Sequence, residues 1–199
     1  MNIPAPDETP DTGPGFDLRA YLRGSWSVAR TLLDRSTGIS GTFTGVVRFT
    51  AHDDGGLSWR EEGTVRWASM GGKSLGGASA DGAPFTGPAS REYLLQPADT
   101  PDVLEVYFPD GRPFHRMSFA EQANHDMHWC DPDTYRVTYR FLGPDECGYR
   151  WDVTGPAKDQ LLESVLHRLE AGPRPAPDAS HNPALDAALD TAQDARRAE

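Results

Sequence analysis

Two charged residues occupy positions where an apolar residue is expected. Arg30 and Glu61 each lie in a stretch in which apolar residues recur at every second position, and each shares their phase. The in-phase residues are Trp26, Val28 and Leu32 around Arg30, and Leu57, Trp59, Val65 and Trp67 around Glu61. Alternate residues of a strand point to one face, so both charges should face the core, where they need partners or a ligand. The pattern predicts either a structural Arg30–Glu61 ion pair or a polar pocket.

Histidine and cysteine side chains supply the other candidate chemistry. His115 lies in phase with Met117 and Phe119, so its ring could bind a ligand, act as a base, or bond a backbone carbonyl as an ordinary core histidine. His128 and Cys130 are two residues apart, and side chains so spaced on one strand can touch. An imidazolium would lower the pKa of the thiol and activate a nucleophile, whereas a buried cysteine otherwise behaves as a small apolar residue.

The segment around His128 resembles a metal site in composition. It contains His125, Asp126, His128, Cys130 and Asp133. Zinc requires three or four converging ligands, and on a strand only His128 and Cys130 converge, with Asp133 or His115 as additions. No Cys-x-x-Cys spacing is present in the sequence, and no local motif marks an axial histidine for haem. The sequence therefore predicts no metal and no other cofactor.

Three further polar residues complete the candidate set. Asp133 precedes a predicted strand that contains Tyr135, and it either caps the turn or belongs to the pocket. Lys158 follows Gly155-Pro156, which breaks the preceding strand, so Lys158 should stand at one end of the sheet. There it either meets an anionic group of a ligand or remains an exposed lysine.

These residues lie in a segment in which apolar and polar residues alternate with period two, from Gly24 to about Thr154. Turn signals such as Pro109-Asp110-Gly111 separate about ten short strands. Such a pattern in ~150 residues fits a closed up-and-down antiparallel β-barrel or a β-sandwich. Gly45 and Gly63, which lie inside strands, permit the strong bends that a barrel needs.

Two segments are harder to assign. Residues 70–90 contain six glycines and two prolines, which predicts a long flexible loop that fits either a lid over the barrel mouth or simple disorder. Asp159–Arg168 favours a helix by its local pattern, because its leucines and valine have helical spacing. The same residues also fit a final strand.

Composition confines the folded domain to the middle of the 199-residue chain. All 5 Trp, 6 Tyr and 8 Phe lie within residues 16–170, so this segment can form the core of a single domain. Residues 1–15 and 171–199 are rich in Ala, Pro and Asp, and they cannot offset the entropy of ordering themselves. The sequence predicts a disordered acidic N-terminal tail, and a C-terminal tail with at most a marginal helix after Asn182.

Charge and cysteine content narrow the partners and the compartment. A net charge of −11 without a basic stripe disfavours nucleic acid. No apolar run approaches the roughly 20 residues of a membrane span, and the first residues lack the pattern of a secretory signal. We therefore expect a small molecule as partner and a cytoplasmic location, with Cys130 and Cys147 as reduced thiols. The sequence does not define the oligomeric state.

Six segments of the predicted core are distinctive when they are taken together and in order. They are Gly24–Arg30 (GSWSVAR), Gly41–Gly45 (GTFTG), Trp59–Gly63 (WREEG), Val106–His115 (VYFPDGRPFH), His128–Tyr135 (HWCDPDTY) and Trp151–Asp159 (WDVTGPAKD). Together they resemble a bacterial lipocalin-like family with no assigned activity. The resemblance implies a calycin-type barrel, and hence a strand at Asp159–Arg168. The opening Gly24-x-Trp26 is similar to the lipocalin start, in which the Trp plugs the barrel floor and an Arg of the last strand, here Arg168, packs across it.

The sequence thus predicts a single antiparallel up-and-down β-barrel of about ten strands, lipocalin-like, with disordered tails. Its predicted function is to bind a small molecule in a partly polar barrel pocket. The candidate binding residues are Arg30, Glu61, His115, His128, Cys130, Asp133, Tyr135 and Lys158. The alternative is a small enzyme of the same fold, an isomerase, cyclase or hydrolase that uses His115 or His128 as acid–base and Cys130 as nucleophile.

Overall fold

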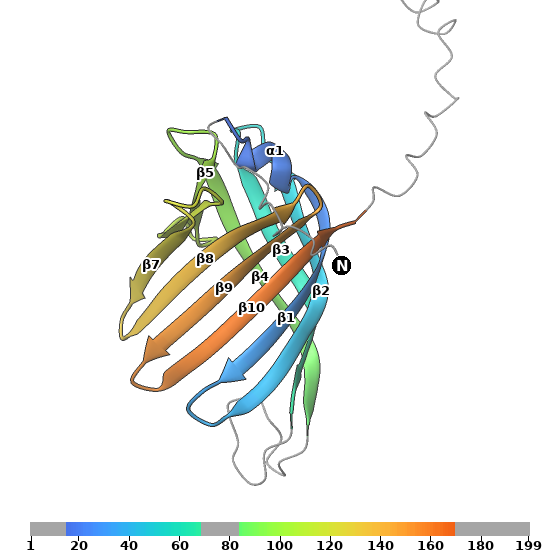
Figure 1. The fold of residues 1–199 in the computed structure, drawn as a ribbon, viewed down its shortest axis with the longest axis vertical. Coiled ribbons are helices and arrows are strands. Elements are labelled where there is room, and N and C mark those ends of the chain that lie inside the picture. The colour runs from blue at the N-terminus through green and yellow to red at the C-terminus, as the bar shows by residue number, and fades with distance from the viewer. Residues whose placement is uncertain (1–14, 69–83, 170–199) are drawn as a thin grey trace, which may run out of the picture.

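The computed structural model describes residues 15–68 and 84–169 of the chain (Figure 1). The predicted tails and most of the predicted loop at 70–90, with the question of a lid, lie outside the described residues. The elements of the described part are α1 (Leu18–Leu22), β1 (Gly24–Asp34), β2 (Ile39–Ala51), β3 (Leu57–Trp67), β4 (Phe85–Pro97), β5 (Val103–Tyr107), β6 (Pro113–Ser118), β7 (His125–Cys130), β8 (Asp133–Gly143), β9 (Glu146–Gly155) and β10 (Lys158–Arg168). Within these ranges, no helix is long and apolar enough to cross a membrane.

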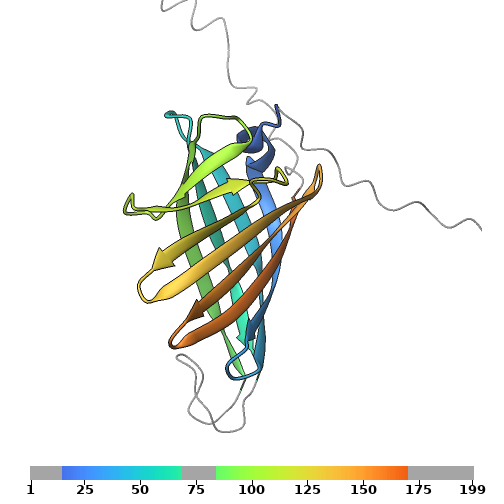
Figure 2. The same cartoon turned by 60° about the vertical axis from the view of Figure 1, so that its left-hand side comes forward.

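The strands of the described part form one ten-stranded antiparallel sheet that curls into a nearly closed barrel. Its order is β6-β5-β4-β3-β2-β1-β10-β9-β8-β7, so β1 pairs with β10 and the edge strands β6 and β7 meet at a seam. Figure 2 shows the fan of β7 to β10 facing β1 to β4 across the interior. At the seam, the backbone N–H of Arg116 donates to the carboxylate of Asp126 at 2.6 Å. The predicted all-β, up-and-down barrel is confirmed.

β4 begins earlier than the sequence predicts. A loop is expected through residue 90, but the strand starts at Phe85 and pairs with β3 from that residue onward. β5 pairs only with Leu94–Pro97, so the first half of β4 has one edge without backbone pairing in the described residues. A strand tolerates a proline such as Pro88 at a free edge. The expected loop over residues 85–90 is wrong, because pairing with β3 overrides the local glycine and proline signal.

The last strand, β10, resolves the ambiguous segment. It lies between β1 and β9 and pairs with both along its length. Ser164 and Leu166 are buried, whereas Glu163 and His167 are exposed, which is the alternation of a strand. The strand implied by the family resemblance is confirmed. The local preference for a helix is overridden because two neighbouring strands supply backbone partners on both edges.

The curl of β2 and β3 requires two glycines that face each other. Gly45 and Gly63 are register partners, and a Cβ on either would overlap backbone atoms of the partner strand. The Phe43 ring also occupies the space beside Gly63, 2.7 Å from where a Cβ would stand. The two glycines therefore allow the close approach and bend that the sequence predicts for them.

One end of the barrel is closed by α1 and Trp26. Asp17 accepts a hydrogen bond from the Ala20 N–H at 2.8 Å and so caps the helix. Trp26 is fully buried, and its indole N–H donates to the Leu22 carbonyl at 2.8 Å. The Arg168 guanidinium lies 4.1 Å from the centroid of the Trp26 ring. The arrangement of Trp26 and Arg168 that the resemblance implies is confirmed, whereas the sequence did not predict α1.

Trp26→Ala should lower the free energy of unfolding by about 3–5 kcal/mol, as for other large buried aromatic side chains. The loss includes apolar burial, the indole hydrogen bond and the Arg168 contact. Urea unfolding followed by far-UV circular dichroism measures it. Trp129 is 62% exposed, so the control Trp129→Ala should change the free energy by less than about 0.5 kcal/mol. A cost for Trp26→Ala below about 1 kcal/mol would contradict its role as the barrel floor.

Candidate binding site

The charged pair predicted from the sequence lies inside the barrel. Arg30 of β1 is 7% exposed and Glu61 of β3 is 2% exposed. Their side chains form a bidentate ion pair, in which Nη1 lies 2.7 Å from Oε1 and Nη2 lies 2.8 Å from Oε2. The prediction that both charges face the core and reach each other is confirmed. β2 lies between β1 and β3 in the sheet. The Arg30–Glu61 ion pair therefore reaches across β2 on the inner face of the barrel.

A second guanidinium shares the same carboxylate. Arg91 of β4 stands opposite Glu61 in the β3–β4 register. Its Nε lies 3.1 Å from Oε1 of Glu61, and its Nη2 donates to Oε2 at 3.2 Å. Sequence analysis missed Arg91, because the glycines and prolines before it hide the phase of β4. The available signal is its alternation with Tyr93 and Leu95, which places the three side chains on one face.

Tyr149 of β9 and Ser164 of β10 complete the network. The Tyr149 hydroxyl accepts from Nη2 of Arg30 at 2.5 Å and from Nη2 of Arg91 at 2.6 Å. The same hydroxyl donates to Oε2 of Glu61 at 3.1 Å. Ser164 Oγ accepts from Nε of Arg30 at 2.8 Å. Sequence analysis did not identify either residue as a member of the site, because each lies in the apolar phase of its strand.

This network carries one net positive charge. Burial pushes the pKa of Glu61 upward, but Arg91 and Arg30 more than offset that effect and hold the pKa below its ordinary value. Glu61 is therefore an anion at neutral pH. Burial raises the pKa of Tyr149, so its phenol stays protonated. Two guanidiniums, which remain charged in proteins, thus face a single carboxylate.

A cavity of about 170 Å³ adjoins the network. Its lining residues are Arg30, Leu32, Phe43, Glu61, Val65, Ala89, Ser90 and Arg91. Leu32 and Val65 follow Arg30 and Glu61 along strands that run away from α1, so the cavity lies on the side of the network opposite the helix (Figure 1). On the α1 side, the void beside Trp59 and Tyr139 measures only about 10 Å³.

His115 forms a separate buried pair with Tyr139. Its Nε2 lies 2.6 Å from the Tyr139 hydroxyl, and His115 is 5% exposed. Burial, with contributions from His128 and Arg91, lowers the pKa of His115 to about 3, and burial raises the pKa of Tyr139. At neutral pH the pair thus consists of a neutral imidazole and a protonated phenol. General acid–base catalysis works best with a pKa near the operating pH, and the pKa of His115 is far from it.

His128 and Cys130 are not joined by a hydrogen bond in the described part of the chain. His128 is half-buried, and its ring packs edge-on against Phe114 at 5.1 Å between ring centroids. Cys130 is exposed and unbonded to Cys147. The structure therefore does not assemble the nucleophile pair that their spacing suggested.

Asp133, Tyr135 and Lys158 meet where β8 and β10 begin. Nζ of Lys158 lies 2.5 Å from Oδ2 of Asp133 and 3.3 Å from the Tyr135 hydroxyl. The bond with Asp133 raises the pKa of Lys158. A Cβ at Gly155 would overlap the Asp133 carboxylate, so this glycine makes room for the pair. Among the predicted binding residues, Asp133, Tyr135 and Lys158 therefore lie together in one place, and Arg30 and Glu61 lie together in another.

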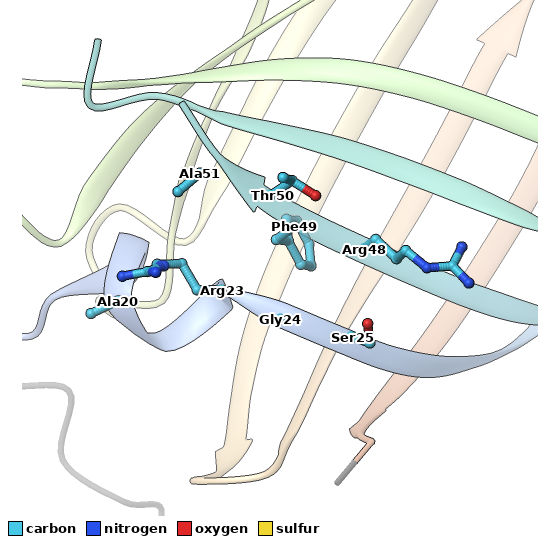
Figure 3. A pocket seen from close by; sticks show the side chains of 8 residues that line it. All are labelled: Ala20, Arg23, Gly24, Ser25, Arg48, Phe49, Thr50 and Ala51. Carbon is cyan, nitrogen blue, oxygen red and sulfur yellow. The ribbon is translucent and has the colours of Figure 1, made fainter. Parts of the chain in front are cut away.

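Outside the barrel, a hollow of about 510 Å³ lies beside α1 (Figure 3). The side chains of Arg23 and Arg48 point to opposite sides of it in Figure 3, and Arg48 pairs with Glu62 at 3.2 Å. Within residues 15–68 and 84–169, no group of three or more His, Cys, Asp or Glu side chains is placed to hold a metal ion. The buried network and its cavity are therefore the candidate site.

The fold is a lipocalin-like barrel of the calycin type, and a charged network lies at the centre of the barrel. Residues 22–168 match a family of unknown function, DUF6314, and the chain belongs to that family. No curated protein matches the sequence.

Several solved structures are similar to this chain. The S-type phycobiliprotein lyase CPES from Guillardia theta gives a TM-score of 0.53 at 10% identity, over 80% of this chain and 95% of that chain. Rv2717c from M. tuberculosis gives a TM-score of 0.37 at 21% identity, over 80% of this chain and 99% of that chain. The redesigned β-barrel mFAP1, bound to DFHBI, gives a TM-score of 0.36 at 15% identity, over 76% of this chain and 99% of that chain. The likeness to the lyase supports the barrel fold, and a shared fold does not define a ligand or a reaction.

Glu61→Leu should cost more free energy of unfolding than Arg30→Met. Loss of Glu61 leaves two buried guanidiniums without a carboxylate, which costs about 3–5 kcal/mol, whereas loss of Arg30 leaves Glu61 paired with Arg91. The double variant should recover part of the loss, with a coupling energy above the ~0.5 kcal/mol of independent sites. Urea unfolding of the four proteins measures this cycle. Additive single costs would contradict the buried pair.

The stabilisation that Glu61 provides should fall in acid. The pKa of Glu61 in the folded state lies below its ordinary value, so its contribution is complete above the unfolded value of about 4.3 and is lost as the pH falls through the folded value. The difference in unfolding free energy between wild type and Glu61→Gln should be largest above about pH 5 and shrink below about pH 4. Exposed Glu163 supplies the control Glu163→Gln. A difference that grows on acidification would overturn the assignment of Glu61 as a stabilising anion.

Proposed function

We propose that this protein binds a small molecule inside its barrel, in the cavity beside Arg30, Glu61 and Arg91. The observation that carries the proposal is the second guanidinium. Arg91 adds a largely buried positive charge to an ion pair that Arg30 and Glu61 already complete. An unbalanced buried charge costs free energy, and a bound molecule that supplies acceptors or negative charge explains why it is there.

The lining of the cavity also suits a ligand. Sites for small molecules are mostly apolar, with a few placed polar groups that fix orientation. Four of the eight lining residues are aliphatic or aromatic, and Arg91 supplies a polar group. The guanidinium of Arg91 lies 5.7 Å from the ring centroids of Trp59, Tyr93 and Tyr149. Packing therefore fixes its position before a molecule arrives.

Binding fits this geometry better than the enzyme alternative. His115 is neutral at neutral pH and bonded to Tyr139, and exposed Cys130 has no hydrogen bond to His128 among the described residues. The similarity to a phycobiliprotein lyase, at 10% identity, supports a common fold and not a common reaction. A bacterial source and a cytoplasmic location stay predictions from the sequence.

Native mass spectrometry of the protein, purified and then incubated with a small-molecule cell extract, tests the proposal. We expect an adduct that is released on denaturation. Ala89→Leu fills the cavity from β4 and should remove the adduct while the protein stays folded. Glu92→Leu is the matched control, because it places the same side chain on the outer face of the same strand, and it should keep the adduct.

Two results would contradict the proposal. If wild type carries no adduct after incubation, the barrel is not a binding site for any component of the extract. If Ala89→Leu carries the same adduct as wild type, the molecule binds outside the cavity. Circular dichroism of each variant shows whether a loss of binding reflects a loss of fold.

A further inference from the structure

The network leaves one guanidinium nitrogen without a partner among the described residues. Arg30 makes four hydrogen bonds, to Ser164, Tyr149 and both oxygens of Glu61. Arg91 makes two, both from Nη2. Its buried Nε lies beside Glu61 but is not aligned for a hydrogen bond. Nη1 of Arg91 is therefore the group that remains to donate to another molecule.

Arg91 is also the member of the ionic cluster that the cavity leaves accessible. Its side chain is 23% exposed, against 5% for the side chain of Arg30 and 2% for that of Glu61. All three residues line the cavity, but the oxygens of Glu61 already receive both guanidiniums. A molecule in the cavity thus meets a hydrogen-bond donor that carries the unbalanced positive charge.

The charge balance specifies how much negative charge the molecule should bring. Two guanidiniums and one carboxylate leave a surplus of one positive charge. One negative charge on a ligand neutralises the site. A second one would find no further unbalanced cation among the described lining residues and would lie near the Glu61 carboxylate, where like charges repel. The site therefore favours a monoanion over a dianion.

The remaining wall of the cavity specifies the rest of the molecule. Apart from the exposed Ser90, the other lining residues, Leu32, Phe43, Val65 and Ala89, are apolar and accept no hydrogen bond from a ligand through their side chains. At about 170 Å³, the cavity is smaller than the ~300 Å³ at the lower end of ordinary small-molecule pockets. This space suits a single ring or a short alkyl chain rather than a long acyl chain or a polycyclic molecule.

We propose that the ligand is a small organic monocarboxylate, whose carboxylate binds Nη1 of Arg91 and whose apolar body lies against Leu32, Phe43, Val65 and Ala89. A carboxylate is the common organic monoanion whose planar oxygens match guanidinium donors. This inference rests on the proposed binding function and adds the chemical class of the ligand. Arg91 orients the carboxylate, and the apolar wall limits the length of the body.

Isothermal titration calorimetry with benzoate and butyrate, each compared with its uncharged amide, tests this inference. Each amide has nearly the shape of its carboxylate, so the comparison isolates the charge. We expect at least one of the two carboxylates to bind wild type at least tenfold more tightly than its amide. Inorganic phosphate, largely a dianion at pH 8, should bind more weakly than that carboxylate.

Variants of Arg91 test whether this residue binds the carboxylate of the ligand. Arg91→Met should reduce the affinity for the carboxylate at least tenfold and remove the preference over the amide, whereas Arg91→Lys should keep part of that preference. Arg48→Met is the matched control: it removes an exposed arginine on the outer face of β2 and should leave both affinities unchanged. Melting curves confirm that the variants are folded. Arg91→Met leaves the Arg30–Glu61 pair intact, so we expect the variant to fold.

The outcomes separate this inference from the proposed function. Equal binding of amide and carboxylate, or tighter binding of phosphate, would overturn the monocarboxylate class while a binding site remains. The monocarboxylate class would also be overturned if neither carboxylate binds and the adduct from the cell extract proves to be neutral. Failure of every probe, with no adduct from the extract, would overturn the binding function itself. Unchanged carboxylate binding by Arg91→Met would show that the carboxylate lies elsewhere.

Discussion

Glu61 is the residue through which opposite walls of the barrel are connected. Its two carboxylate oxygens contact Arg30, Arg91 and Tyr149, and Arg30 extends the network to Ser164. These residues come from β3 and β4 on one side of β1 and from β9 and β10 on the other. A buried guanidinium requires a counter-charge, so neither arginine is stable in this interior without Glu61. The spacing of the walls, and with it the cavity, depends on one carboxylate.

The network divides the barrel interior into two halves with different properties. Toward α1, Trp26, Trp59 and Tyr139 pack among aromatic and aliphatic side chains, and the void beside Trp59 and Tyr139 measures only about 10 Å³, as in other protein cores. On the other side, the residues that follow Arg30 and Glu61 along their strands line a cavity of about 170 Å³. The closed half supplies apolar burial, which dominates stability. The polar layer can therefore serve the cavity without being the main source of stability.

Period-two alternation predicted most of the strands and placed Arg30 and Glu61 inside, because a strand has only two faces. It failed where local sequence and long-range pairing disagree. Pairing with β3 makes residues 85–90 a strand despite their glycine and proline, so the inward phase of Arg91 was hidden. Tyr149 was not identified as a site residue, since the partners of its hydroxyl lie on strands that are distant in the sequence. The helix α1, at five residues, is too short to show a period.

The residues that sequence reasoning missed are those on which the proposed specificity of the site rests. An Arg30–Glu61 pair alone is electrically balanced, and it explains the burial of both residues without any ligand. Arg91 unbalances the pair, and Tyr149, which accepts from both guanidiniums, holds Arg91 in place. A side chain that is already immobilised loses little conformational entropy on binding. In the proposed mode of binding, Tyr149 acts without touching the ligand, because the network that it completes fixes the direction of the remaining donor, Nη1 of Arg91.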